Sequence, residues 1–274
     1  IPPFGWKVVD PESSSDKVIV KADAIESSHY LVKFDDNMNI VSLYDKDNER
    51  EVIKSGETAN QLRLFEDYPR EWDNWEITSY YKSKMWEIND VSAVEQISGN
   101  GVGGFKITRK YNNSVINQTI LLYENSRRID FITDVDWHEN HVLLKAAFPT
   151  TIHTNKANYE IQFGYVERPT HENTSWDKAK FEVCAQKWGD LSEEGYGVSI
   201  LNNCKYGYSA DGSEMSLTLI KCGTFPNEVA DQGHHSFTYS LYPHKDSFKQ
   251  GKTIEEAYLL NRPMEALYSD GVGS

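Results

Sequence analysis

Alternation of apolar and polar residues recurs along the chain, whereas the spacing of an amphipathic helix is scarce. In RRIDFITDVDW (127–137), one face carries Phe131, Val135 and Trp137, and the opposite face is mostly aspartate. Such a pattern is typical of a strand that is buried on one side. Ten segments alternate in this way or are rich in β-forming residues: 29–35, 39–45, 104–111, 115–123, 127–137, 159–166, 181–188, 196–202, 215–221 and 235–243.

Turn residues separate these segments, and the clearest hairpin is predicted at 29–45 around DDNMN. A helical pattern occurs only weakly, near TIEEAYLLNRPM. The sequence therefore predicts an all-β fold with few helices. With 274 residues and 12% aromatics, the simplest architecture is a large antiparallel β-sandwich. We expect a leading segment over residues 1–25 and the β domain over 26–274.

The charge balance limits the partners of the chain. Lys and Arg number 28 against 42 Asp and Glu, for a net charge of −14. Phosphate backbones and anionic membranes would be repelled, so we expect no nucleic-acid or membrane partner. No apolar run has the length of a membrane span. Three widely separated cysteines, without C-x-x-C spacing, favour a reducing compartment and predict a cytoplasmic protein.

The segment FEDYPREWDNWEI (65–77) combines two tryptophans with five acids in a stretch that resembles a loop more than a strand. In one interpretation, Trp72 and Trp75 are core aromatics and the acids form a solvated rim. In the other, the loop binds sugar, because C–H faces of a sugar stack on aromatic rings while carboxylates bind hydroxyls. Asp73 and Trp75 are the candidate substrate-binding residues of this loop.

A second irregular segment, ERPTHENTSWDKAKFE (167–182), is dense in side-chain hydrogen-bonding groups. Its candidate substrate-binding residues are Arg168, His171 and Asp177, although a surface position would also explain the histidine. Pro169 restricts Arg168 to an extended backbone, which favours a fixed loop.

Catalytic and metal-binding signatures are weak. Asp67 and Asp73 would be the first pair to examine for glycosidase chemistry, which needs two carboxyl groups roughly 5–9.5 Å apart. His234 and His235 are adjacent in a predicted strand and point to opposite faces, so they are poor partners for one metal. H-E-x-x-H and G-x-S-x-G motifs are absent from the sequence. We assign no catalytic residue and no metal ligand to the chain.

Three stretches resemble one known family: ANQLRLFEDYPREWDNWEI (59–77), the long stretch 160–208 and GHHSFTYSLYPH (233–244). They are similar to the C-terminal β region of class II α-mannosidases, glycoside hydrolase family 38, and most of all to its cytosolic and vacuolar branch. The segment 29–53 is similar to the start of that region.

The resemblance implies a β-supersandwich, related to galactose-mutarotase-like domains, that packs against an N-terminal catalytic domain. In the family, zinc and the nucleophilic Asp of a retaining mechanism belong to that other domain, and no position here matches them. The resemblance thus implies that this chain is a domain of a zinc-dependent α-mannosidase. By the same resemblance, the domain is non-catalytic by itself and forms one wall of the cleft that binds the α-mannoside substrate.

Family members usually continue beyond YLLNRP (258–263), so we expect a C-terminal piece that is truncated at its C-terminal end. Two alternatives stay open. One is a stand-alone carbohydrate-binding or epimerase-like β-sandwich. The other is a scaffold without sugar contact that mediates packing or homo-oligomer formation.

Overall fold

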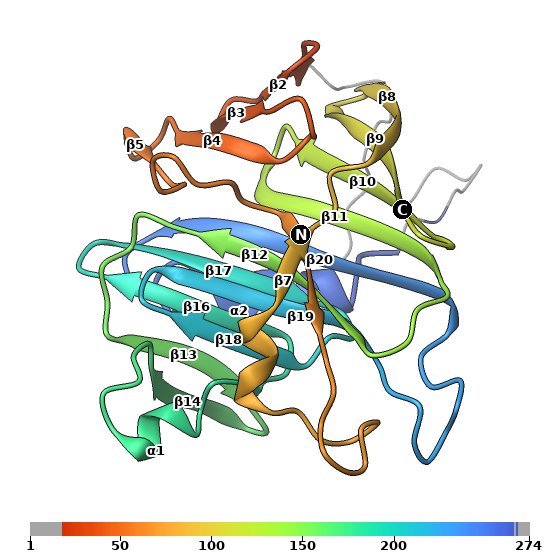
Figure 1. The fold of residues 1–274 in the computed structure, drawn as a ribbon. Helices are drawn as coiled ribbons and strands as arrows, with labels where there is room; N and C mark the ends of the chain where they lie inside the picture. Colours follow the sequence, from red (N-terminus) through yellow and green to blue (C-terminus); the bar gives the residue numbers. More distant parts are fainter. Residues whose placement is uncertain (1–17, 266, 268–274) are drawn as a thin grey trace.

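The computed structural model describes residues 18–265 and 267 as an antiparallel all-β protein built from three sheets (Figure 1). The prediction of an all-β fold with few helices is confirmed. The N-terminal sheet has the strand order β1 (Ile19–Val20), β2 (Ala24–Glu26), β3 (Tyr30–Phe34), β4 (Ile40–Asp45) and β5 (Arg50–Glu51). The predicted 29–45 hairpin is the pair β3–β4. The expected leading segment, residues 1–25, lies outside the described residues up to position 17, and from Ile19 onward it contributes to this sheet.

The largest sheet has nine strands. Most neighbours are consecutive in the chain, and the last strand, β20, returns to lie between β17 and β11. Its order is β14 (Gly164–Pro169), β13 (Lys156–Ile161), β16 (Trp188–Glu193), β17 (Tyr196–Asn202), β20 (Gly233–Lys245), β11 (Ser126–Trp137), β10 (Ser114–Tyr123), β9 (Val102–Tyr111) and β8 (Val91–Gly99). The predicted single strand at 159–166 is wrong, because a turn at Gln162 and Phe163 divides it into the hairpin β13–β14.

The six-stranded sheet has the order β15 (Val183–Cys184), β18 (Gly207–Asp211), β19 (Glu214–Cys222), β12 (Val142–Pro149), β6 (Gln61–Glu66) and β7 (Met85–Glu87). The prediction of one strand over 181–188 is also wrong, since only the short β15 and the first residue of β16 are extended there. Strand β12 was not predicted. All eight of its residues are buried, so it shows no alternation.

The nine- and six-stranded sheets face each other across one apolar core. The ring centroids of Phe131 on β11 and Phe148 on β12 are 5.8 Å apart. Phe148 also packs edge-on against Tyr239 of β20. The N-terminal sheet joins the same core through residues such as Val32. This arrangement is a β-sandwich with a third sheet attached.

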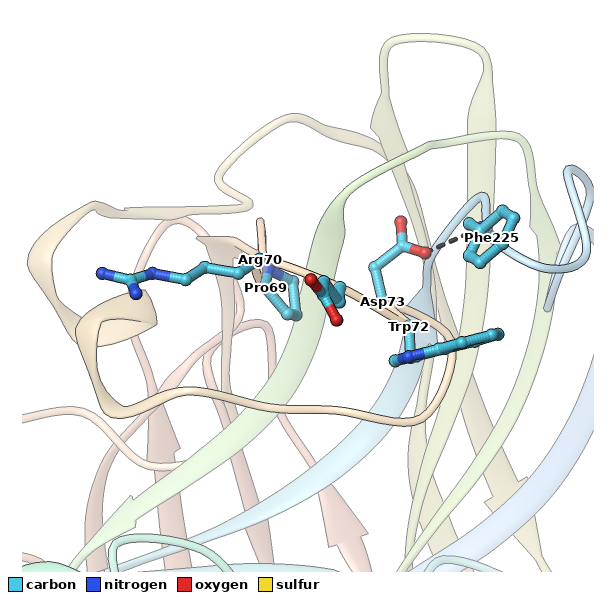
Figure 2. Close-up of a pocket in the computed structure, with 6 residues that line it drawn as sticks. Pro69, Arg70, Trp72, Asp73 and Phe225 are labelled. Carbon is cyan, nitrogen blue, oxygen red and sulfur yellow. Dashed lines mark hydrogen bonds between the residues drawn. The ribbon is translucent and has the colours of Figure 1, made fainter.

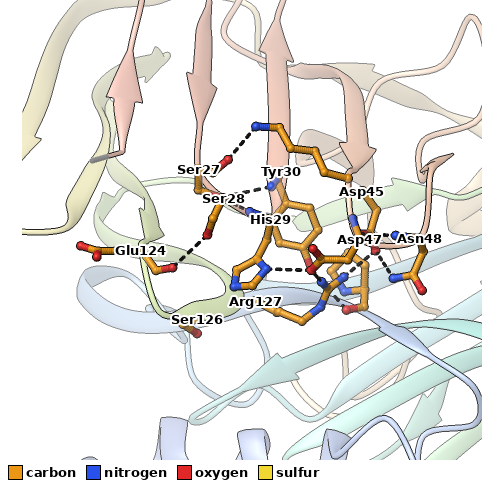
Figure 3. Close-up of polar contacts among 12 residues, drawn as sticks. Ser27, Ser28, His29, Tyr30, Asp45, Asp47, Asn48, Glu124, Ser126 and Arg127 are labelled. Atoms are coloured by element: carbon orange, nitrogen blue, oxygen red, sulfur yellow. Dashed lines mark hydrogen bonds and ion pairs between the residues drawn. The ribbon is translucent and has the colours of Figure 1, made fainter. Parts of the chain in front are cut away.

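A buried polar cluster fixes the N-terminal sheet to the sandwich (Figure 3). Asp45 at the end of β4 accepts a hydrogen bond of 2.7 Å from the hydroxyl of Tyr196 on β17. Arg127 of β11 pairs with both Asp45 and Asp47, and its guanidinium lies 5.0 Å from the ring centre of Tyr30. Because Asp45 is fully buried, these partners are needed to offset its desolvation.

Helices are short and peripheral: η1 (Ser79–Ser83), α1 (Ser175–Lys178) and α2 (Thr253–Asn261). The weak helical pattern near residues 253–264 is confirmed by α2, which packs on the nine-stranded sheet over Trp188, Leu201 and Tyr242. Within the described residues, no helix has the length and apolar character needed to cross a membrane.

Candidate functional site

The chain between β6 and η1 leaves the sheet and forms an extended loop at one edge of the sandwich, as Figure 1 shows for the segment after β6. Its first residue is fixed to the β11–β12 connection, since the Asp67 amide donates to the carbonyl of His141 at 2.9 Å. The ring of Tyr68 stacks on the His141 imidazole with a centroid distance of 4.1 Å. The loop therefore leaves the sheet from a fixed base.

Asp73 attaches the same loop to the β19–β20 connection. Its carboxylate accepts hydrogen bonds from the backbone amides of Thr224 at 2.9 Å and Phe225 at 2.7 Å. Burial opposes ionisation, but these amides outweigh it, so the pKa of Asp73 is lowered. A Cβ at Gly223 would lie 2.7 Å from the Asp73 backbone, so this close approach requires glycine. Asp73 thus has a clear structural role as an anchor of the loop.

The two tryptophans are exposed, which excludes the interpretation that they belong to the core. Trp75 is 72% exposed and Trp72 is 47% exposed. Their rings stack nearly parallel, 10° apart with centroids at 5.6 Å, and Phe225 lies 5.1 Å from Trp72. Trp72 has a positive φ of 54°. The stacked rings form an aromatic surface that faces solvent.

Beside this surface lies a pocket of about 410 Å³. In Figure 2, Trp72 and Phe225 lie on one side of the pocket and Arg70 extends on the other. The lining residues are Pro69, Arg70, Glu71, Trp72, Asp73 and Phe225, and we call this site the tryptophan pocket. It places an aromatic face beside a guanidinium and carboxylates, the groups that bind sugar rings and hydroxyls.

The acid pair considered for catalysis is engaged in other contacts. Asp67 is buried, and its carboxylate lies 2.6 Å from the ammonium of Lys221. Burial raises the pKa of Asp67, although Lys221 acts in the opposite direction. Lys221 also donates to the backbone carbonyl of Asp73. Both acids therefore connect the loop to β19 and the connection that follows it.

The second irregular segment forms a compact turn around α1. Thr174 and Asp177 make a capping box, in which the Asp177 carboxylate accepts from the Thr174 hydroxyl at 2.7 Å and from its amide at 3.2 Å. These bonds, the hydroxyl first, lower the pKa of Asp177. His171 lies 3.7 Å from the same carboxylate, and Arg168 is the penultimate residue of β14. None of these three candidate residues lines the tryptophan pocket.

Helix η1 connects the two irregular segments through a cluster that sequence reasoning missed. The Tyr81 hydroxyl donates to Glu182 at 2.6 Å, and Glu182 also pairs with the buried Lys145 of β12. Burial lowers the pKa of Lys145 even though Glu182 acts against that shift. A further ion pair of 3.0 Å joins Lys82 to Glu172. The residues come from three separate parts of the chain, so no local pattern indicates them.

The histidines of the third segment have separate partners. On β20, His234 lies 3.3 Å from Asp134, whereas His235 donates to the backbone carbonyl of Asp231 at 2.7 Å. His244 is buried against Asp190 at 2.8 Å. Across residues 18–265 and 267, no group of three or more His, Cys, Asp and Glu side chains is arranged to hold a metal ion.

Solved structures share this fold. An α-mannosidase from Enterococcus faecalis V583 superposes with a TM-score of 0.75 at 15% identity, covering 91% of this chain and 32% of its own. An α-N-acetylgalactosaminidase from Bifidobacterium bifidum gives a TM-score of 0.52 at 12% identity. The three-sheet architecture is thus that of a β domain found within larger glycoside hydrolases.

Residues 25–228 match the model of the glycosyl hydrolases family 38 C-terminal domain, and the chain belongs to this family. Human alpha-mannosidase 2C1 is 37% identical over 281 residues, with 97% of this chain and 27% of the relative covered. Alpha-mannosidase G of Dictyostelium discoideum is 39% identical, with 95% and 26% covered. The chain spans about a quarter of the length of these relatives.

Proposed function

We propose that this chain acts as the C-terminal domain of a larger, cytoplasmic α-mannosidase that hydrolyses terminal α-mannosyl residues. The family match over residues 25–228 supports the enzyme class, and the names of the relatives support the substrate. The retaining mechanism and its zinc ion belong to another domain in this proposal. The described residues lack a fitting ligand set, so no step of the reaction is assigned to a metal on this chain.

The domain is non-catalytic by itself in this proposal and forms a wall of the substrate cleft. The loop beside the tryptophan pocket carries the argument, because Trp75, which stacks on the pocket residue Trp72, is 72% exposed and the loop is fixed by hydrogen bonds. A solvent-facing ring on a fixed loop is placed to stack on a sugar without further ordering. Asp73, the other candidate in this loop, holds that position through its bonds to Thr224 and Phe225. Arg168, His171 and Asp177 remain candidates for the same wall.

Substitution of Trp75 in the longer enzyme tests this role. Trp75→Ala should lower kcat/KM for an aryl α-mannoside about tenfold, the loss expected for one stacked ring, and leave the melting temperature unchanged. Tyr44→Ala is the matched control, because Tyr44 is an exposed aromatic on β4 of the N-terminal sheet. Equal kcat/KM for Trp75→Ala and wild type would contradict a contact between this loop and the substrate.

A further inference from the structure

A second concave site lies between the β13–β14 hairpin and α2. It has a volume of about 440 Å³ and shares no lining residue with the tryptophan pocket. We call it the hairpin groove, and its lining residues are Glu160, Ile161, Gln162, Phe163, Gly164, Tyr165, Gln186, Lys187, Trp188, Ile254 and Tyr258. The volume is within the range of small-ligand sites, roughly 300–1,000 Å³.

Aromatic rings stand on both sides of the hairpin groove. Tyr165 projects from β14, and Tyr258 lies one helical turn after Ile254 on the outward side of α2. All three side chains are exposed, and Tyr258 is 53% exposed. The two walls thus present flat apolar surface to whatever enters the groove.

Phe163, at the tip of the hairpin, has two features that are unfavourable for the stability of the chain. It is fully exposed, and its φ of +64° places a bulky residue in a conformation that favours glycine. The next residue is Gly164, but its φ is not positive. The left-handed backbone conformation of this turn therefore falls on Phe163 and not on the glycine. Phe163 therefore offers an exposed aromatic ring beside the groove that no contact within the described fold uses.

The groove offers hydrogen-bonding groups without net charge. Lys187 pairs with Glu160 at 2.8 Å, and its ammonium lies 4.5 Å from the ring centre of Tyr258. The side-chain amides of Gln162 and Gln186 have no hydrogen-bond partner within the described part of the chain. Among the lining residues the one cation and the one anion neutralise each other, and the nearby Lys249 ammonium is engaged by the Tyr165 hydroxyl at 3.1 Å, so the groove suits a neutral ligand better than a phosphate or a carboxylate.

One buried donor on the groove wall lacks an acceptor. The side chain of Trp188 is 1% exposed, and its indole N–H has no partner among residues 18–265 and 267. A buried donor without an acceptor has a free-energy cost. A ligand oxygen at the base of the groove, reached after a small shift of the surrounding side chains, would remove this cost.

We propose that the hairpin groove binds one hexopyranose ring of a neutral oligosaccharide. A pyranose has an apolar C–H face for the tyrosine rings, and its hydroxyls accept from an indole N–H and exchange hydrogen bonds with glutamine amides. It carries no charge, as the groove requires. This site is separate from the tryptophan pocket, and its existence does not depend on the proposed enzymatic role.

Titration of the purified chain with methyl α-D-mannopyranoside and α-1,2-mannobiose tests the proposal. The readout is the indole N–H signal of Trp188 in two-dimensional ¹⁵N NMR, assigned with Trp188→Phe. We expect a saturable shift of this signal with a Kd on the order of 1 mM, as ligand size predicts. Glycerol, which has hydroxyls but no ring, should produce no saturable shift.

Variants separate the groove from other sites. Tyr258→Ala should weaken the sugar about tenfold, and Gln162→Leu on the turn should also weaken it, whereas Trp75→Ala and Tyr44→Ala should not. The proposal is overturned if the Trp188 signal does not move at about 50 mM sugar, far above the expected Kd. It is also overturned if only the Trp72 and Trp75 signals respond, or if Phe163→Ala changes sedimentation but sugar has no effect, which would indicate a protein interface.

Discussion

The tryptophan pocket and the hairpin groove each contain an exposed aromatic residue with positive φ, but the contacts that stabilise this residue differ between the two sites. Trp72 stacks on Trp75 and packs against Phe225, and Asp73 binds the adjoining connection. Phe163 stands at the tip of a two-residue turn, fully exposed. The comparison teaches that a strained residue can be compensated within the fold at one site and left uncompensated at another. Only the second site should gain stability when the strain is removed.

Loss of the Asp73 carboxylate should have the largest effect. Asp73→Ala leaves the amides of Thr224 and Phe225 without their acceptor, so we expect the free energy of unfolding to fall by about 3 kcal/mol. Chemical denaturation of the purified chain measures this value. The matched control is Glu71→Ala in the same loop, since Glu71 is exposed and should change stability by less than about 0.5 kcal/mol.

The same anchor predicts a pH dependence. Because the folded-state pKa of Asp73 is lowered, its contribution is fully present above the ordinary aspartate pKa and is lost as the pH falls through the lower, folded value. Between pH 6 and pH 3, wild type should therefore lose more stability than Asp73→Asn. Parallel stability curves for the two proteins would exclude the carboxylate as the anchor.

Removal of the Trp72 ring should have the second-largest effect on the free energy of unfolding. Trp72→Gly relieves the positive φ but removes the contacts to Trp75 and Phe225, and we expect a net loss of about 2 kcal/mol. Thermal unfolding of this variant measures whether the stacked rings compensate the strained backbone. A gain in stability would show that the stacked rings do not compensate the backbone.

The corresponding change at the hairpin should have the opposite sign. Phe163→Gly relieves the left-handed conformation without losing buried surface, so the free energy of unfolding should rise by about 1 kcal/mol. Phe163→Ala keeps the strain and should give little gain, which makes it the control. If both variants are equally stable, backbone strain at position 163 is not the cause.

The smallest effect on stability is expected for Trp75. Trp75→Ala removes a ring that is 72% exposed, and the change should stay within about 0.5 kcal/mol of wild type. Denaturation curves check this value. A loss of more than about 2 kcal/mol would make Trp75 a structural residue and would weaken its assignment as a sugar contact.

Alternation predicted strands whose two faces differ in burial, such as the hairpin 29–45 and β10. Strand β17, which is buried on both faces, was predicted from its β-rich composition instead. Strand β12 is buried on both faces, and its sequence VLLKAAFP therefore lacks alternation. Residues 159–166 were predicted as one strand because Gln162 and Phe163 are unusual turn residues, and the turn is evident only from the pairing of Ile161 with Gly164 and the positive φ of Phe163 in the structure.

Composition located the loop of the candidate site but not the contacts of its residues. The composition of 65–77 indicated a loop but left open whether its tryptophans lie in the core or bind sugar, and the structure shows Trp75 in solvent. The sequence could not show that Asp73 binds the backbone of Phe225, because 152 positions separate them along the chain. Phe225 and Glu182 were missed for the same reason, since their partners are distant in sequence.

The most direct test of the proposed role is the hydrolysis of 4-nitrophenyl α-D-mannopyranoside by the purified 274-residue chain, with and without added zinc. The longer enzyme that carries the domain serves as the positive control. The account predicts turnover by the longer enzyme and none by the chain alone under either condition. Zinc-dependent turnover by the chain alone, abolished by a chelator and restored by the metal, would contradict a non-catalytic domain.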